Sequence, residues 1–298
     1  MLATVAPVQA DTYETFTDWC VNKDNLPAET QHTIEVLLDK ADTQECDSAE
    51  ERFSLQNSLD IDEEQLVDIL PLATFQHLER LSLNRNHIQD IIPLASLTNL
   101  KELGLASNNI QDISPLTDLL NLYKLDLSYN EIAEISPLNN LTELSYLTLV
   151  GNDVVDISAL GSLNNLWELR LNSNRISDLS SLARLPQLRD LSLRNNEISD
   201  ISPLANFDNL EELDLDLNSI SEFPPLPGLK NLHTLSLNKN KFKATPLVDG
   251  LIGLEKLSLE ENEIEDISSL SSLTNLRRLN LNQNRVQDLT PLLGLVEL

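Results

Sequence analysis

The chain has 298 residues, among which 48 acidic and 20 basic side chains give a formal charge of −28 at neutral pH. A charge of that size repels nucleic-acid phosphates and anionic lipids, so the composition argues against nucleic acid or a membrane surface as the partner. No apolar stretch of about 18 residues occurs, so we expect no insertion into a membrane. Aromatic residues make up only 4% of the chain, so leucine and isoleucine must form the core.

Residues 1–10 read MLATVAPVQA and carry no charged side chain. The small residues Val8 and Ala10, just before Asp11, resemble the cleavage end of a secretory signal peptide. The basic segment and the long apolar segment of such a signal are missing, so we expect the natural chain to begin upstream. The alternative is a disordered terminus with no targeting role.

Residues 11–58 do not repeat and have the pattern of three short helices. The first helix has apolar residues at helical spacing, at Tyr13, Phe16, Trp19 and Cys20. Pro27 suits the first turn of the second, and Asp47 with Glu50 has the spacing of a capping box that opens the third. We expect these helices to cover the apolar end of the first repeat, and an independent binding module is the alternative.

The chain has two cysteines, Cys20 and Cys46. An even number beside a secretory remnant predicts one disulfide bond, which would stabilise the fold by roughly 3–4 kcal/mol. The alternative is a pair of buried free thiols. No histidine lies at ligand spacing from either cysteine, so the pair does not predict a zinc site.

Residues 59–298 repeat with a period of 22 residues. Each regular copy reads Leu-x-x-Leu-x-Leu-x-x-Asn, and three of the ten continue as Ile-x-Asp-Ile-x-Pro-Leu, as in the copy that ends at Leu116, while the others carry variants of it. An earlier, degenerate copy starts at Leu59 and has Glu64 at the asparagine position. The ten regular asparagines are Asn86, Asn108, Asn130, Asn152, Asn174, Asn196, Asn218, Asn240, Asn262 and Asn284.

This period has a direct physical interpretation. The alternating x-Leu-x-Leu-x segment is a short strand with one buried face, and successive copies should pair in a parallel sheet. The asparagines should stack and hydrogen-bond the backbone of neighbouring turns. The acidic residue that precedes each Pro-Leu turn, such as Asp112, should cap a short helical or 3₁₀ segment. Cation binding by this acidic column is the less favoured alternative.

The repeat resembles the 22-residue class of leucine-rich repeats found in bacterial internalins and related secreted proteins. The resemblance implies an α/β fold, namely a right-handed solenoid with a parallel sheet on its concave face and short 3₁₀ turns on its convex face. It also implies a helical N-terminal cap and recognition of proteins through the concave face. The last repeat stops at Leu298 without a polar cap, so we expect the natural protein to continue.

Candidate binding residues are the variable positions on either side of the strand leucines, which should face solvent on the concave side. Tyrosine and tryptophan are enriched at binding hot spots, and neighbouring charges favour a partner of complementary charge. The alternative is that surface positions vary freely and the clustering is accidental. The predicted partner-binding set is an aromatic group with one valine (Tyr123, Tyr129, Tyr146, Val150, Trp167), a basic strip (Arg170, Arg189, Arg194) and an acidic strip (Glu212, Asp214, Asp216).

The sequence contains no recognisable catalytic constellation. Only His233 among the four histidines falls in a concave position, and no nucleophile is placed to use it. Asp214 and Asp216 lack the glycine turn and bidentate glutamate of a calcium loop, so we predict no metal site and no cofactor.

We therefore predict a monomeric, non-catalytic scaffold that binds a protein partner and is secreted, periplasmic or displayed at the cell surface. The alternative is an intracellular scaffold or regulatory subunit of the phosphatase-regulator type. An oxidised Cys20–Cys46 bond would favour the first hypothesis.

Overall fold

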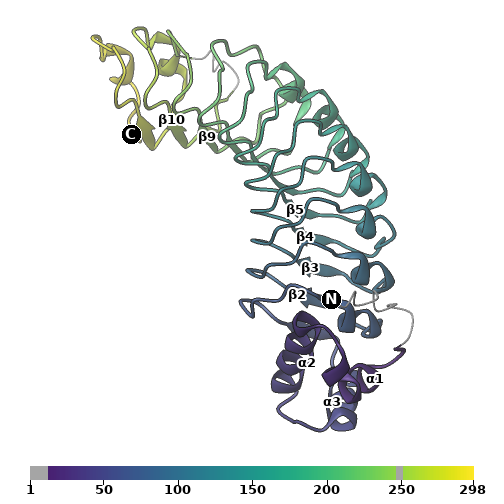
Figure 1. The fold of residues 1–298 in the computed structure, drawn as a ribbon. Helices are drawn as coiled ribbons and strands as arrows, with labels where there is room; N and C mark the ends of the chain where they lie inside the picture. Colours follow the sequence, from purple (N-terminus) through teal and green to yellow (C-terminus); the bar gives the residue numbers. More distant parts are fainter. Residues whose placement is uncertain (1–12, 246–250) are drawn as a thin grey trace, which may run out of the picture.

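The computed structural model describes residues 13–245 and 251–298, so the signal-peptide remnant predicted at residues 1–10 lies outside the described residues. Figure 1 shows three helices at one end of a curved stack of repeats. The helices are α1 (Phe16–Val21), α2 (Ala28–Lys40) and α3 (Cys46–Ser54), with a 3₁₀ turn, η2 (Lys23–Asn25), after the first. No described helix is long and apolar enough to span a bilayer.

One parallel sheet runs through the whole stack, and within the described residues its eleven strands follow chain order. The central leucine of each strand pairs with the leucine one repeat later, as Leu125 does with Leu147, so the sequence period sets the register. Each strand has three residues. The strands are β1 (Ser58–Asp60), β2 (Arg80–Ser82), β3 (Glu102–Gly104), β4 (Lys124–Asp126), β5 (Tyr146–Thr148), β6 (Glu168–Arg170), β7 (Asp190–Ser192), β8 (Glu212–Asp214), β9 (Thr234–Ser236), β10 (Lys256–Ser258) and β11 (Arg278–Asn280).

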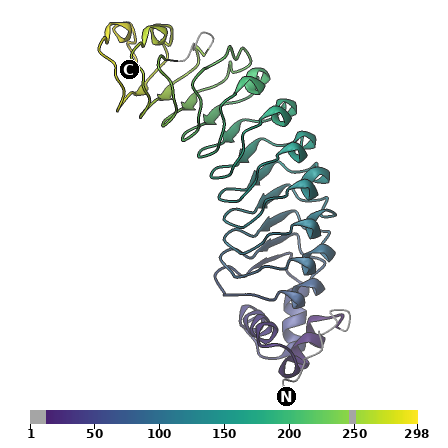
Figure 2. The same ribbon diagram turned by 45° about the horizontal axis from the view of Figure 1, so that its top comes forward.

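The strands line the concave side of the arc and the 3₁₀ helices line its convex side (Figure 2), which confirms the predicted solenoid. Where the residue before a convex helix is aspartate, it binds the helix's first backbone N–H, as in the 2.8 Å bond from Ser114 N to Asp112 Oδ1. This bond lowers the pKa of Asp112. The convex helices are η3 (Leu70–Thr74), η4 (Ile92–Ser96), η5 (Ser114–Leu116), η6 (Ser136–Asn140), η7 (Ser158–Ser162), η8 (Ser180–Arg184), η9 (Ser202–Asn206), η10 (Ser268–Ser272) and η11 (Thr290–Leu292).

The interior combines stacked leucines with a file of asparagines. Leu125 and Leu127 are fully buried. Asn130 donates from Nδ2 to Leu105 O and Leu127 O at 2.9 and 3.0 Å, and its Oδ1 accepts from Ile110 N at 3.0 Å. Each asparagine therefore satisfies buried backbone groups in its own repeat and in the preceding one, which locks adjacent repeats in a single register.

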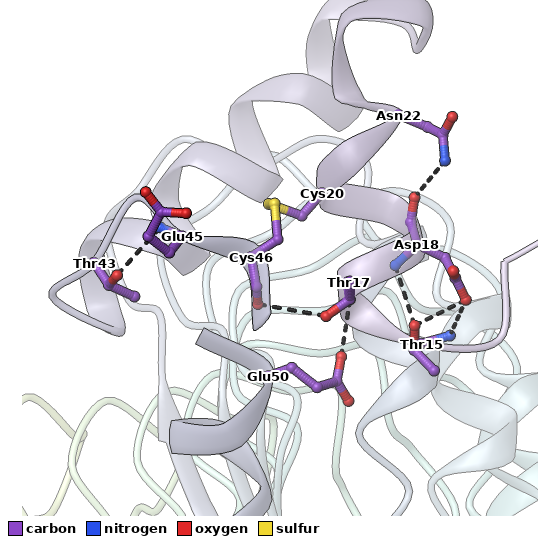
Figure 3. The surroundings of a disulfide bond; sticks show 9 residues. All are labelled: Thr15, Thr17, Asp18, Cys20, Asn22, Thr43, Glu45, Cys46 and Glu50. Carbon is purple, nitrogen blue, oxygen red and sulfur yellow. Dashed lines mark hydrogen bonds between the residues drawn. A yellow bond between two sulfur atoms is a disulfide. The ribbon is translucent and has the colours of Figure 1, made fainter. Parts of the chain in front are cut away.

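The N-terminal helices pack on the first repeats and are joined by a disulfide bond between Cys20 and Cys46 (Figure 3). Phe16 and Phe53 meet edge to face with ring centroids 5.6 Å apart, and Phe75 of the repeats packs on Phe53 at 5.0 Å. This aromatic contact links α1 and α3 to the repeat stack.

The capping box predicted at Asp47 is wrong, because α3 begins at Cys46 and its N-cap makes no side-chain hydrogen bond. Glu50 instead accepts a 2.9 Å bond from the backbone of Thr17 in α1 (Figure 3). A capping box does occur on α1, where the side chains of Thr15 and Asp18 each bind the other's backbone N–H. Glu50 therefore joins two helices rather than closing one.

Candidate binding face on the concave sheet

The side chains on the concave face form four columns that run across the strands. In the repeat of β5 they are Ser145, Tyr146, Thr148 and Val150, which define the entry, first, middle and third columns. Neighbours in a column come from adjacent repeats and lie about 4.8 Å apart. A ligand on this face therefore meets side chains that are 22 residues apart in the sequence.

Three aromatic residues gather over β4 to β6 and form what we call the aromatic patch: Tyr123, Tyr146 and Trp167. Tyr123 and Trp167 belong to the entry column and are 40% and 45% exposed. Tyr146 stands between them in the first column and is half-buried, and its neighbour Lys124 places its amine 5.3 Å from the Tyr146 ring centroid. Burial and the nearby Glu168 carboxylate raise the pKa of Tyr146, so its hydroxyl stays a neutral donor.

Tyr129 lies apart from this patch, as its position toward the end of the strand predicts. It lies in the turn that leaves the strand, with φ of 54° and 61% exposure. Val150, in the third column, is half-buried on the neighbouring repeat. The alternation of faces ends after the second strand leucine because the chain turns there, and Tyr129 is the second residue beyond it.

The position of Tyr129 is part of a column of left-handed residues that the sequence did not reveal. In this column φ lies between 53° and 67°, and ten different repeats tolerate a side chain there. The only glycine is Gly151, whose added Cβ would lie 2.7 Å from the ring of Tyr129. The members are Glu63, Arg85, Ser107, Tyr129, Gly151, Ser173, Asn195, Leu217, Lys239, Glu261 and Gln283.

We expect Gly151→Ala to lower the free energy of unfolding by about 2–3 kcal/mol, as the sum of left-handed strain and the clash with Tyr129. In a Tyr129→Ala background the clash is absent, so the same change should cost only about 1 kcal/mol. Urea unfolding of the four proteins in this cycle measures both values. Equal losses in the two backgrounds would show that the ring does not require the glycine.

The basic and acidic strips predicted from the sequence interlock rather than standing apart. Arg170 Nε lies 2.7 Å from Glu168 Oε1, and Glu168 is only 7% exposed. Arg194 Nη1 lies 2.7 Å from Asp216 Oδ2 in the next repeat. Arg189 likewise pairs with Glu211 at 3.0 Å. The residue types alone predict the two strips. Which arginine pairs with which carboxylate depends on the side-chain rotamers that reach the neighbouring repeat.

Asp190, Glu212 and Asp214 make β7 and β8 the negative part of the face, and of these Asp190 Oδ2 lies 3.6 Å from Arg170 Nη2. Burial raises the pKa of Asp190 and that of Asp214, and it is the main cause of the shift in both. Glu212 is exposed and forms no ion pair within the described part of the chain. A cationic group on the partner would therefore be stabilised here.

A hollow of about 290 Å³ lies next to the aromatic patch, over β1 to β4. Its floor includes Gly104, where an added Cβ would lie 2.9 Å from Asn84 Nδ2. Arg80, Glu102 and Lys124 stand around it. The repeat pattern does not predict this hollow, although Gly104, the one glycine at a middle-column position, is a sequence signal for it.

Among residues 13–245 and 251–298, no group of three or more histidine, cysteine or acidic side chains is arranged to hold a metal ion. His233 is exposed in the entry column beside Glu211 and Glu255 of the neighbouring repeats. The concave face thus presents aromatic rings, charges and shallow hollows.

Comparison with known proteins agrees with this geometry. A family model described as leucine-rich repeats (two copies) matches residues 76–121, 164–206 and 252–294. The crystal structure of the internalin InlF from Listeria monocytogenes is 29% identical with a TM-score of 0.67, and the match covers 92% of this chain and 97% of that one. The chain is a leucine-rich-repeat solenoid that is similar to this internalin over most of its length.

Other structures share the solenoid at lower coverage. The functional domain of InlJ from Listeria monocytogenes is 22% identical, with a TM-score of 0.67, covering 83% of this chain and 58% of that one. The PEPR1–AtPEP1 structure is 26% identical with a TM-score of 0.63, covering 72% of this chain and 33% of the other. A search of curated protein sequences gave no match.

Proposed function

We propose that this protein is a non-catalytic scaffold that binds a protein partner through its concave face, centred on the aromatic patch and the Gly104 hollow. The observation that carries the proposal is the exposure of Tyr123 and Trp167, at 40% and 45%, on a rigid stack of strands. Exposed tyrosine and tryptophan rings are unfavourable in water and are the side chains most enriched at binding hot spots.

The scaffold is well suited to this task because its columns are preorganised. The asparagine file and the leucine core hold every strand in register, so a partner need not order the face on binding. Among the similar structures, that of PEPR1 with AtPEP1 is a complex, which supports ligand binding by a solenoid of this kind.

We propose supporting roles for the other predicted residues of the face. Tyr129 and Val150 border the aromatic patch on the side where the strands end. The paired arginines and acids of β6 to β8 set the charge that the partner meets: Arg170, Arg189, Arg194, Glu212, Asp214 and Asp216.

We also propose that residues 11–58 act as the cap and residues 59–298 as the repeat domain of a monomer that works outside the cytoplasm. Contacts between the cap and the first repeat support this division, such as the 2.7 Å bond between His32 Nε2 and Glu64 O. The Cys20–Cys46 disulfide favours an oxidising compartment over an intracellular, phosphatase-regulating role.

The binding proposal can be tested without knowing the natural partner. Peptides selected from a random displayed library on the immobilised protein should bind the Tyr146→Ala, Trp167→Ala double variant at least about thirtyfold more weakly, the loss typical of a hot-spot residue. Isothermal titration gives the dissociation constants, and far-ultraviolet circular dichroism checks the fold.

A matched control removes an exposed apolar side chain from the convex side. Ile92 is 66% exposed in η4, and Ile92→Ala should leave the affinities unchanged. Selected peptides that bind the double variant as tightly as the wild type, or that depend on Ile92 instead, would refute the assignment of the concave face.

A further inference from the structure

A second hollow, of about 300 Å³, lies on the concave face over β9 to β11, far along the sheet from the aromatic patch. Thr234, Lys256 and Arg278 occupy adjacent places in the first column, because their strands pair in that register. The smaller Ser236 and Ser258 line the hollow beside them. Two cations and a hydroxyl thus stand in one row, with about 4.8 Å between neighbouring positions.

The other basic side chains around this hollow are neutralised, and these two are not. Arg277 pairs with Glu255 at 3.3 Å, and Lys239 pairs with Glu261 at 3.1 Å. Lys256 and Arg278 are exposed and form no ion pair with any carboxylate of residues 13–245 and 251–298. The chain has 48 acidic residues against 20 basic ones, so two unpaired cations side by side are unusual for it.

The other polar groups near the hollow already have hydrogen-bond partners, so Lys256 and Arg278 are the main donors available to a ligand. Glu260 Oε2 already accepts a 2.8 Å bond from Asn280 Nδ2. The hydroxyls of Ser236 and Ser258 donate to Asp216 and Asn238, at 2.6 and 2.7 Å, so their protons are used within the sheet. Like charges on neighbouring strands repel each other, and an anion between them would remove that repulsion.

We propose that the Lys256–Arg278 hollow is a site for a carboxylate group from an acidic segment of the protein partner. The inference rests on the proposed function, because it gives the chemistry of a second contact on the same face. β10 is four strands from β6, or about 20 Å, which an extended segment of about six residues spans. Such a segment would place an apolar group on the aromatic patch, a basic group over β7 and β8, and acidic side chains at the hollow.

Nuclear magnetic resonance of the ¹⁵N-labelled protein tests the site directly. The probe is N-acetyl-Glu-Glu-amide, added at a constant ionic strength of about 0.1 M, which limits repulsion by the net charge. We expect saturable shifts of the Arg278 Nε–Hε signal and of the β9 to β11 amides. Lys256→Gln with Arg278→Gln should weaken the binding by roughly tenfold or more, since each charge-assisted bond is worth about that factor.

Two controls separate this site from the rest of the face. Arg277→Gln removes an adjacent cation that already has a partner, and it should leave the probe's affinity unchanged. The Tyr146→Ala, Trp167→Ala variant should also bind the probe normally, so failure of the aromatic patch and failure of this site give different results.

Sodium sulfate, titrated in parallel, distinguishes a peptide carboxylate from a sulfate or phosphate group. Stronger saturable binding of the diglutamate probe than of sulfate supports the proposal. Saturable shifts with sulfate alone, shifts that never saturate, or shifts that persist in the Lys256→Gln, Arg278→Gln variant would overturn it.

Discussion

Replacing Asn152 with alanine should lower the free energy of unfolding by about 3–5 kcal/mol. Asn152 is 8% exposed and donates from Nδ2 to Leu127 O and Leu149 O, at 3.0 and 3.1 Å. Its Oδ1 accepts a 3.0 Å bond from Ile132 N. Alanine would leave the Ile132 N–H buried without a partner, which costs about 1–3 kcal/mol. Leu127 O and Leu149 O would each lose one of two donors, because they also accept from Asn130 and Asn174. Each of these lost bonds costs about 1 kcal/mol. Urea unfolding followed by circular dichroism measures the loss.

Asn165 provides the matched control, because its Nδ2 also binds the preceding repeat, at 2.9 Å to Thr142 O, but on an exposed part of the surface. Water can replace that bond, so Asn165→Ala should cost only about 1 kcal/mol. Equal losses for the two variants would mean that burial of the asparagine file does not matter.

The effect of Asn152→Ala should also be local. Each repeat contacts only its neighbours, so stability is close to a sum of repeat and interface contributions. Hydrogen exchange should therefore quicken in the amides of β4 to β6 before those of β10 and β11. The same logic explains how one face can vary in sequence from repeat to repeat while the backbone stays constant.

The 22-residue period predicts most of this fold from the sequence. The spacing of Leu122, Leu125 and Leu127 requires a strand with one buried face, and its recurrence every 22 residues requires parallel pairing in register. An asparagine at the position of Asn130 then satisfies the buried backbone groups of the turn by hydrogen bonds from its side chain. Neither inference needs knowledge of any contact between surface side chains.

The features that sequence reasoning missed depend on contacts across repeats. The sequence predicts Arg194 and Asp216 in separate strips, yet they form one ion pair because the arginine side chain reaches across to the next repeat. The left-handed turn column has no sequence signature, since side chains as different as those of Tyr129 and Leu217 occupy it. Glu50 has the spacing of a capping box but binds Thr17, which only the packing of α1 on α3 decides.

Removing the disulfide by Cys20→Ser with Cys46→Ser should lower the free energy of unfolding by about 3.5 kcal/mol, the loop-closure value for a sequence separation of 26 residues. The bond joins α1 to α3, whose Phe16 and Phe53 form the aromatic cluster that packs on the first repeats. Without it, the cap should separate from the repeat stack at a lower urea concentration.

The two tryptophans allow this to be measured, because Trp19 is 2% exposed in the cap and Trp167 is exposed on the concave face. In a Trp167→Phe background, Trp19 fluorescence reports on the cap alone, and its urea midpoint should fall in the double serine variant. The wild-type cysteines in a reducing agent should give the same midpoint. An unchanged midpoint in both cases would show that packing at Phe16 holds the cap without the bond. A bond that does not stabilise the cap would no longer favour an oxidising compartment.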